Sequence, residues 1–203
     1  MTRKEAIISS ATRLFAEKGY KETSMAELAG VTGVAQGTIF YHFKNKEELF
    51  LSILKDFKLN IVREFENHIR DNRFENGMEM LENVLSFYFY IAGAMEDRFL
   101  ILHRRDAYEL AKTNPSFREH LEAIYNCLVD IFEKAILMGQ KDKSIRDISA
   151  KKGALIIFSM ADGLARLNTY NLYDPGGLYE DLLDACRRIL CNVNESEEEI
   201  YAD

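Results

Sequence analysis

Residues 24–49 read SMAELAGVTGVAQGTIFYHFKNKEEL, and this stretch decides the fold of the front of the chain. A capping box at Ser24–Glu27 predicts the start of a short helix, and Gly33 interrupts the helical pattern soon afterwards. A second short periodic segment runs over about residues 36–43, and another capping box follows at Asn45–Glu48. The stretch therefore predicts two short helices joined by a glycine turn, and the start of a third helix.

The residues before this stretch predict one more helix. A capping box at Thr2–Glu5 precedes apolar residues at three-to-four spacing, and Gly19 supplies a stop. Isolated helices of two or three turns are marginal, so the three helices within residues 2–43 must pack against one another. Three short helices with a glycine turn between the second and third describe a helix-turn-helix module. Its predicted core contains Leu14, Phe15, Leu28, Val31, Val34, Ile39 and Phe43.

Helical patterns continue through the rest of the chain. Only two prolines and 11 glycines interrupt 203 residues, whereas sandwiches and barrels need turn residues much more often. A pattern from Lys46 to about Arg70 is long enough to link two domains. Further helices are predicted at about residues 77–95, 97–112, 115–139, 148–172 and 178–193. We therefore predict an all-α protein, with a helix-turn-helix domain at residues 1–46 and a larger helical-bundle domain at residues 47–203.

The charge of the chain is distributed unevenly between these two predicted domains. The formal net charge is −7, but residues 1–46 contain seven Lys or Arg against four Asp or Glu, and residues 47–203 carry the acidic excess. Because the negative charge of nucleic acid attracts basic protein surface and repels acidic surface, we expect any DNA contact to be made by residues 1–46. The acidic tail, residues 194–203, is predicted to be poorly ordered.

Several other classes of protein are excluded. The longest apolar stretch, Phe87–Met95, is far shorter than the roughly 18 residues that span a bilayer, and the first residues lack the pattern of a secretory signal. We therefore expect a cytoplasmic protein without membrane contact. Three cysteines without CxxC spacing are expected to be buried thiols, not disulfide or zinc ligands. The chain has no GxGxxG, P-loop or HExxH pattern and no histidine pair at helical metal spacing, so we predict no catalytic residue, metal or cofactor.

The predicted third helix carries residues suited to DNA. In a helix-turn-helix module this helix enters the major groove with its N-terminus first, so its leading turn meets bases and phosphates. Gln36 can pair with adenine, and Thr38 offers a hydroxyl group to phosphate and a methyl group to thymine. Gly37 costs about 1 kcal/mol relative to alanine inside a helix, which suggests close approach by a partner. The alternative is a tolerated glycine.

Three more residues, which follow Thr38 in the sequence, are suited to contact phosphates. Lys46 places a cation in the first turn of a helix, where it opposes the helix dipole unless a phosphate lies nearby. Tyr41 and His42 supply hydrogen-bond donors on the same exposed side, although each alone is also an ordinary surface aromatic residue.

About residues 5–50, roughly a quarter of the chain, resemble the tetracycline-repressor (TetR/AcrR) family of bacterial transcriptional regulators, and the remaining predicted helices fit the family by number and length only. The resemblance rests on ATRLFAEKGY at residues 11–20, TSMAELA at residues 23–29 and GVAQGTIFYHFKNKEEL at residues 33–49. It implies a homodimer whose two N-terminal domains bind a palindromic operator in double-stranded DNA, and an effector-binding and dimerisation domain at residues 47–203. On matching positions, the resemblance assigns DNA contacts to Thr23, Ser24, Gln36, Gly37, Thr38, Tyr41, His42 and Lys46.

Two positions depart from the family pattern. The family often has Ser or Thr where Ala35 stands, so the third helix lacks its usual cap. It commonly has Tyr where Phe40 stands, so a phosphate hydrogen bond from that hydroxyl group is missing.

The predicted helix at residues 148–172 is apolar nearly all round, which is typical of a helix buried on more than one side. With the last predicted helix it resembles the four-helix dimer interface of the family, and a twofold dimer matches a palindrome. The alternative is the core helix of a monomer. The predicted interface residues are Leu155, Phe158, Leu164, Leu182, Cys186 and Ile189.

Aromatic residues concentrate in the middle of the chain, and some of them could line an apolar effector pocket. The predicted contacts are Phe87, Tyr90, Tyr125 and Phe158, although core packing is the alternative for each. For the cluster at residues 103–105, surface or interdomain salt bridges are favoured over ligand binding. We predict a repressor that is released from DNA by a small, largely hydrophobic or aromatic effector. The helix over residues 46–70 is expected to transmit the conformational change from the effector-binding domain to the DNA-binding domain. The alternative is a helical protein–protein interaction module without DNA binding.

Overall fold

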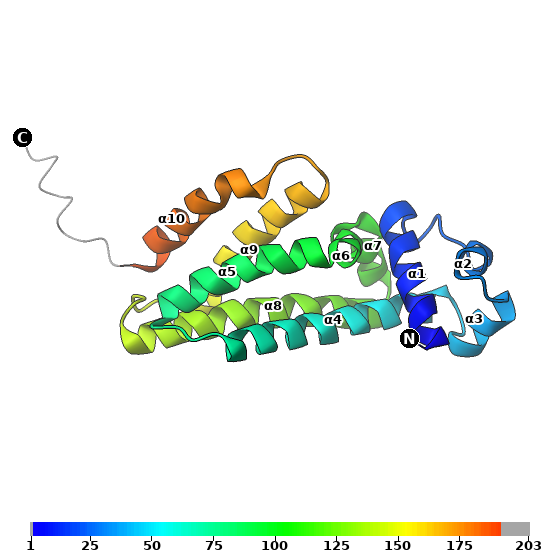
Figure 1. Ribbon diagram of the computed structural model, residues 1–203, viewed down its shortest axis with the longest axis horizontal. Coiled ribbons are helices and arrows are strands. Elements are labelled where there is room, and N and C mark those ends of the chain that lie inside the picture. Colours follow the sequence, from blue (N-terminus) through cyan, green and yellow to red (C-terminus); the bar gives the residue numbers. More distant parts are fainter. Residues whose placement is uncertain (1, 192–203) are drawn as a thin grey trace, which may run out of the picture. The chain divides into compact units, whose positions relative to one another are not determined.

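The computed structural model describes residues 2–191, and all regular structure in this range is helical (Figure 1). The helices are α1 (Arg3–Lys18), α2 (Met25–Thr32), α3 (Gln36–His42), α4 (Lys46–Asp71), α5 (Gly77–Ala94), α6 (Glu96–His103), α7 (Arg105–Thr113), α8 (Pro115–Asp142), α9 (Ala150–Thr169) and α10 (Tyr179–Leu190), with a short 3₁₀ helix at Pro175–Leu178 before α10. The predicted all-α class is confirmed. The predicted acidic tail, residues 194–203, lies outside the described residues.

The described chain forms two compact units. The first unit contains residues up to 67 together with residues 90–127, and the second contains residues 68–89 together with the described residues from 128 onward. Helices α4, α5 and α8 each contribute to both units. The functional division into residues 1–46 and 47–203 stays a prediction.

The first unit is built around α1, which packs against α2 and α6. Its core contains a cluster of aromatic rings, in which Phe50 of α4 lies 5.3 Å from Phe15, 5.2 Å from Tyr20 and 5.5 Å from Phe117 between ring centroids. Aromatic pairs at these separations stabilise a core beyond their buried area. This cluster joins the N-terminal helices to α4 and α8 within one core.

The predicted helix boundaries of the N-terminal helices are confirmed by their caps. Thr2 and Glu5 form both bonds of the capping box, at 3.2 and 2.7 Å. Gly19 (φ 93°) and Gly33 (φ 67°) end α1 and α2 in backbone conformations that favour glycine. Helix α3 begins at Gln36 without a side-chain cap, as the alanine at position 35 predicts.

The prediction of one helix at residues 97–112 is wrong. The structure has two helices, because Arg104 between them is extended (φ −71°, ψ 144°). The break serves tertiary contacts: the guanidinium of Arg104 donates to the carbonyl oxygen of Ala16 at 2.8 Å, and Asp106 accepts from the backbone N–H of Tyr20 at 2.8 Å. His103 is buried, which contradicts a surface position for this residue of the cluster at 103–105. Helical periodicity carries no information on such contacts.

Smaller differences concern the remaining predictions. Val31, expected in the core of the N-terminal helices, is 43% exposed. Helix α9 ends at Thr169, before the predicted 172, and a turn with Asn171 at φ 52° follows. The last predicted helix, at residues 178–193, corresponds to α10 (Tyr179–Leu190). The 3₁₀ helix precedes it, and there the Asp174 carboxylate accepts from the backbone N–H of Gly176 at 2.9 Å.

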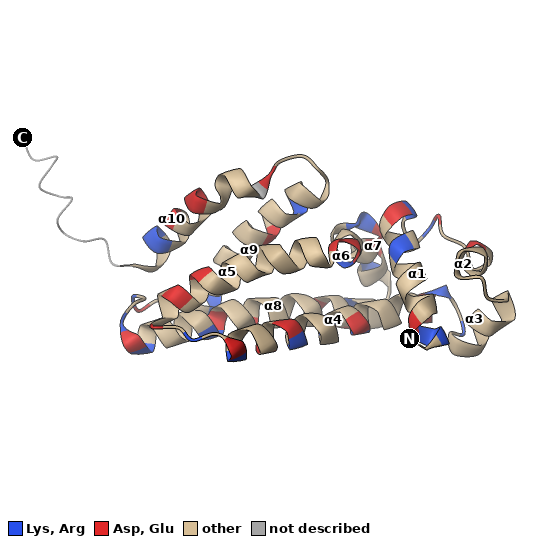
Figure 2. Cartoon of the chain, viewed as in Figure 1, with Lys and Arg blue, Asp and Glu red and all other residues tan. Residues whose placement is uncertain are grey.

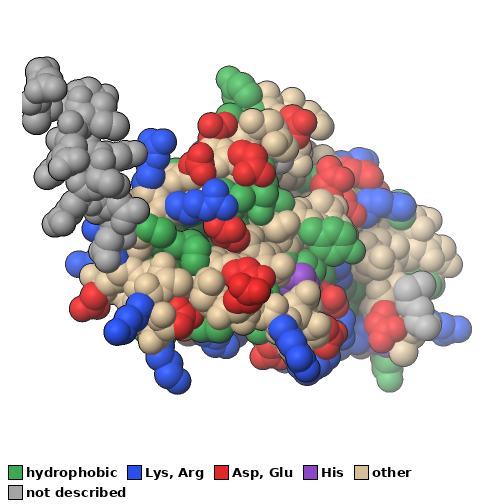
Figure 3. All heavy atoms as spheres, turned by 60° about the vertical axis from the view of Figure 1, so that its left-hand side comes forward, with side chains coloured by type: hydrophobic (Ala, Val, Ile, Leu, Met, Phe, Trp, Pro, Cys, Tyr) green, Lys and Arg blue, Asp and Glu red, His purple; other side chains and the backbone are tan. Residues whose placement is uncertain are grey.

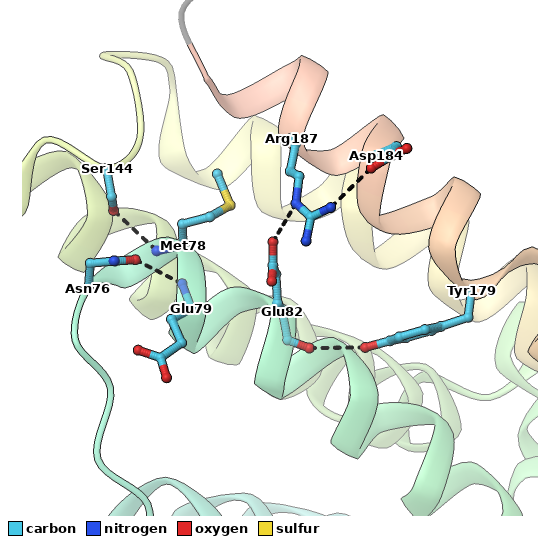
Figure 4. Close-up of polar contacts among 8 residues, drawn as sticks. All are labelled: Asn76, Met78, Glu79, Glu82, Ser144, Tyr179, Asp184 and Arg187. Atoms are coloured by element: carbon cyan, nitrogen blue, oxygen red, sulfur yellow. Dashed lines mark hydrogen bonds and ion pairs between the residues drawn. The ribbon is translucent and has the colours of Figure 1, made fainter.

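In the second unit, polar contacts hold α10 against α5 (Figure 4). Arg187 of α10 donates to Glu82 of α5 at 2.7 Å and to Asp184 of its own helix at 3.0 Å, while the Tyr179 hydroxyl donates to the carbonyl oxygen of Glu82 at 3.4 Å. Where α5 meets α8, a Cβ on Gly77 would come 2.0 Å from the backbone nitrogen of Gly139. Glycine is therefore required there by close approach.

Candidate nucleic-acid interface

Helix α3 divides into a buried face and an exposed face. Ile39 is fully buried, and Phe43 directly after the helix is also buried, so these two side chains anchor α3 to the unit. Gln36, Gly37, Phe40 and Tyr41 are exposed, and their spacing places them on the opposite side of the helix. Thr38 and His42 are half-buried. All five predicted DNA contacts on α3, Gln36, Gly37, Thr38, Tyr41 and His42, are therefore at least partly accessible to a partner.

Gly37 has no structural role that explains its lack of a side chain. A Cβ built at this position meets no atom within 4 Å, and the backbone is ordinary α-helix. Alanine would therefore fit within the chain and would favour the helix by about 1 kcal/mol. Either a binding partner requires glycine at position 37, or the glycine is simply tolerated there.

The side chains of Thr23 and Ser24 are both used within the chain. Thr23 is 2% exposed, and its hydroxyl donates to the carbonyl oxygen of Gly19 at 2.9 Å. Ser24 is exposed, and its hydroxyl oxygen accepts from the backbone N–H of Glu27 at 3.0 Å as the cap of α2. The Ser24 hydroxyl hydrogen is left for a further acceptor, whereas the Thr23 side chain faces the interior.

Lys46 also has contacts that its sequence position did not predict. Its Nζ atom donates to the carbonyl oxygens of Tyr20 at 2.6 Å and Thr23 at 2.9 Å, and it lies 4.4 Å from the centroid of the Tyr20 ring. Burial lowers the pKa of the ammonium below its ordinary 10.5, while the carboxylates of Asp106 and Glu22 oppose this shift. The cation at the start of α4 therefore stabilises the turn between α1 and α2.

The sequence analysis missed the contacts that Arg104 and Asp106 make with the end of α1 and the α1–α2 turn. Together with Lys46, they form hydrogen bonds to the backbone of Ala16, Tyr20 and Thr23. The only sequence signal was the presence of two charged residues in the middle of the helix predicted at residues 97–112. A contact over more than 80 residues of sequence leaves no local pattern.

The charges around the interface lie beside α3 and not on it. Helix α3 contains no Lys, Arg, Asp or Glu, whereas both signs occur on α1 (Figure 2). Lys18 of α1 pairs with Glu27 of α2, and each lowers the cost of charging the other: the pKa of Lys18 is raised and that of Glu27 is lowered. In the described part of the chain, Lys21 and Lys44 form no ion pair, so both cations are available to a polyanion.

The acidic remainder of the chain does not form one uniform negative surface. On the face drawn in Figure 3, acidic and basic side chains alternate, with hydrophobic side chains between them. Several acids of the chain are also paired, as in the contact of Lys151 with Asp130 and Glu133. The net negative charge is therefore partly neutralised locally.

The four predicted effector contacts fall in the two units. In the first unit, Tyr90 is largely exposed and the hydroxyl of Tyr125 lies 2.5 Å from that of Tyr108. In the second, Phe87 stacks on His68 with ring centroids 3.7 Å apart, and Phe158 is buried 5.9 Å from the ring of Tyr88. The effector role of these four residues stays a prediction.

The predicted dimer residues divide by burial. Phe158, Leu182 and Cys186 are buried within a single chain, and burial raises the pKa of the Cys186 thiol to about 11. Leu155 is 53% exposed, and Leu164 and Ile189 are half-buried. Beside them, a groove of about 620 Å³ between α9 and α10 is lined by Ser159, Met160, Gly163, Leu164, Arg166, Leu167, Leu178, Asp181 and Leu182.

Among the described residues, no helix is both long and apolar enough to cross a membrane, and no group of three or more His, Cys, Asp or Glu side chains is arranged to hold a metal ion.

Three short helices with an αL glycine between the second and third, and an exposed leading turn on the third, define the helix-turn-helix class of DNA-binding proteins. The model of the family described as bacterial regulatory proteins, tetR family, matches residues 7–53. An uncharacterized HTH-type transcriptional regulator of Haemophilus influenzae is 30% identical over 165 residues, which cover 77% of this chain and 82% of that protein. The chain belongs to the tetR family.

Other relatives extend this likeness. The fatty acid metabolism regulator protein of Bacillus subtilis is 25% identical over 157 residues, which cover 77% of this chain and 78% of that protein. Two solved structures share the fold. FadR from Bacillus subtilis in complex with stearoyl-CoA has a TM-score of 0.74 at 22% identity, over 90% of this chain and 96% of that chain. A putative regulator from Saccharomonospora viridis in complex with choline has a TM-score of 0.80 at 20% identity, over 93% and 97%.

These findings establish the class of function. The relatives are transcriptional regulators, and this chain is a transcriptional regulator and not an enzyme.

Proposed function

We propose that this protein is a ligand-responsive repressor, which binds a palindromic operator as a homodimer in the cytoplasm and is released by a small, largely hydrophobic or aromatic effector. The observation that carries the DNA-binding proposal is the leading turn of α3. Gln36 and Gly37 are exposed there, and Gly37 has no neighbour within 4 Å that excludes a side chain. A partner that approaches the backbone closely explains this surface.

The proposed DNA contacts differ in kind. Gln36 and Thr38 face bases, and Gly37 permits close approach. Tyr41 and His42 donate to phosphates, as does the exposed hydroxyl of Ser24 at the N-terminus of α2. Thr23 has its hydroxyl committed to Gly19, so its proposed phosphate contact is through the backbone. Lys46 adds positive potential near the phosphates while it holds the α1–α2 turn.

The proposed dimer places a second copy of the chain over α9 and α10. Leu155 and Ile156 are 53% and 50% exposed, and the neighbouring groove exposes Leu167 and Leu178. Apolar residues in such numbers on adjacent helices are typical of an interface between subunits. Phe158, Leu182 and Cys186 support this face from within each chain. A twofold axis there matches the symmetry of a palindrome.

The proposal of a hydrophobic or aromatic effector rests on the aromatic character of the predicted contact residues. Phe87, Tyr90, Tyr125 and Phe158 offer aromatic surface, and the structures of similar fold contain stearoyl-CoA and choline. Thermal shift and operator release across a library of apolar and polar metabolites test this proposal. A response to small polar compounds alone contradicts it.

Release of DNA requires that the effector bind better to a form of the dimer whose DNA-binding domains are wrongly spaced. Within the first unit, the α1–α2 turn is tied to α4 by Lys46 and to the α6–α7 junction by Arg104 and Asp106. We propose that a shift of α4 reaches the DNA-binding helices through these bonds. A disulfide that fixes the C-terminal end of α4 should abolish release of the operator by the effector. Unchanged release contradicts the proposed role of α4.

Selection of bound sequences from random DNA tests the function most directly. We expect a palindrome with half-sites about 34–36 Å apart, and an affinity whose logarithm falls with the logarithm of salt concentration by about 0.9 per neutralised phosphate. A weak, salt-independent signal supports the alternative, a helical interaction module without DNA binding.

The dimer is tested by Leu155→Glu, with Leu137→Glu as a control at a half-exposed leucine of α8. Leu155→Glu should give monomers by sedimentation and an operator affinity lower by about 10²-fold or more, because the second contact is no longer intramolecular. The control should remain dimeric. A dimer in both variants contradicts the proposed interface.

A further inference from the structure

Phe40 is a half-exposed aromatic side chain on the surface of α3. It lies in the middle of α3 and is 45% exposed, whereas its neighbour Ile39 is fully buried and Phe43 is 1% exposed. Among the described residues, none of the aromatic ring contacts in the first unit includes Phe40. The packing of the N-terminal helices therefore does not explain a phenylalanine at this position.

The position of Phe40 relates it to the leading turn of α3. Residues three and four apart lie on one side of a helix, so Phe40 shares its side with Gly37 and Gln36. Helical side chains lean toward the N-terminus of their helix, so the surface that the Phe40 side chain covers lies over this leading turn. Gly37 has no side chain there, and the space near it is open. An apolar ring thus stands beside a glycine on the surface that we propose to enter the major groove.

The chemistry of the ring limits what it can recognise in DNA. Phenylalanine has no hydroxyl group, so it cannot donate a hydrogen bond to a phosphate or to a base edge. The major groove presents one apolar group on its base edges, the C5-methyl group of thymine. A phenyl ring in contact with that methyl group removes apolar surface of both from water.

We propose that Phe40 determines sequence specificity by contact with a thymine methyl group in each half-site of the operator. This proposal rests on the proposed operator binding. It divides the reading of the operator between a polar contact by Gln36 and an apolar contact by Phe40, one helical turn apart.

The test exchanges thymine for deoxyuridine, which removes the methyl group and leaves base pairing unchanged. In an operator recovered by selection, symmetric pairs of thymines are replaced one pair at a time, and affinity is measured for the wild type, Phe40→Ala and Phe40→Tyr. At one thymine position we expect the wild type to lose about fourfold in affinity per half-site, the factor that burial of one methyl group supplies. Phe40→Ala should bind the thymine and deoxyuridine operators equally, and Phe40→Tyr should retain the preference because it keeps the ring.

The controls separate this proposal from the proposed function. Leu137→Ala removes an equally exposed apolar side chain from α8 and should leave both the affinity and the methyl preference unchanged. Thermal melting of Phe40→Ala measures any loss of stability, and the methyl preference is a ratio of affinities within each variant, so a change in stability does not alter it. If no operator is recovered, the proposed function fails. If an operator is bound but tolerates deoxyuridine everywhere, or if Phe40→Ala keeps the preference, operator binding stands and the role of Phe40 is overturned.

Discussion

The turn between α1 and α2 and the leading turn of α3 both carry residues that the family motif assigns to DNA, but the structure uses them differently. In the first, the Thr23 hydroxyl donates to the carbonyl oxygen of Gly19, and Lys46 of α4 donates to carbonyl oxygens of the turn. In the second, Gln36 and Gly37 are exposed, and nothing in the chain requires the glycine. One motif therefore contains residues that hold the DNA-binding helices together and residues that a partner can reach.

Because of this difference, a mutation in the motif can abolish DNA binding in two ways. A substitution in the α1–α2 turn can weaken binding because the helices are displaced or unfolded. A substitution on the exposed face of α3 can weaken binding without any loss of stability. Measurement of unfolding and of operator affinity on the same variant distinguishes the two cases.

The largest effect is expected for Lys46→Met. This change keeps the aliphatic chain but removes the donor to the carbonyl oxygens of Tyr20 and Thr23, and an acceptor left without a partner costs about 1–3 kcal/mol. We expect the free energy of unfolding in urea to fall by about that amount. Lys44→Met, at an exposed lysine two residues earlier, should change stability little.

The same pair of variants, Lys46→Met and Lys44→Met, can also show that Lys46 binds DNA and does not stabilise the α1–α2 turn. If Lys46→Met leaves stability unchanged, and instead lowers affinity and reduces the salt slope of binding by about 0.9, Lys46 is a phosphate ligand and not a support of the turn.

A smaller effect, of opposite sign for stability and binding, is expected for Gly37→Ala. Alanine favours the helix, so unfolding should require up to about 1 kcal/mol more, while the added methyl group should weaken operator binding. Gly30→Ala is the matched control, because Gly30 of α2 is also exposed and has no neighbour within 4 Å. It should stabilise the protein without loss of affinity. Equal affinity in both variants would leave Gly37 a tolerated glycine.

The smallest effect is expected at the ion pair that connects α1 with α2 on either side of their turn. The ammonium of Lys18 holds the pKa of Glu27 below its ordinary 4.5. Because the folded pKa is lowered, the contribution of the pair to stability is present above pH 4.5 and is lost as pH falls through the lowered pKa. A carboxyl-carbon NMR titration should show this lowered pKa, and Lys18→Met should return it toward 4.5. An unchanged titration in Lys18→Met would assign the shift to another cause, such as the backbone hydrogen bond to Ser24.

Local sequence signals located most of the helices because their causes are local. The capping residues Thr2 and Ser24 and the stop residues Gly19 and Gly33 act within a few residues of their positions, and each has the predicted role. The break at Arg104 was not predictable in this way, since its contact with Ala16 joins residues that are 88 positions apart. The exposure of Val31 was missed for a related reason: helical spacing identifies an apolar residue but not which of two faces has a neighbour.

By itself the sequence determined the all-α class, the helix-turn-helix segment and its family, because caps, glycine stops and three-to-four spacing are written in neighbouring residues. Only the tertiary structure decided which motif residues are accessible. It turned Thr23 and Lys46 toward the chain's own carbonyl groups, left Gln36, Gly37 and Phe40 on the surface, and buried Cys186 within one chain. The physical reason is that burial and hydrogen bonding depend on which distant segments pack together, and a residue's type and spacing do not specify its neighbours.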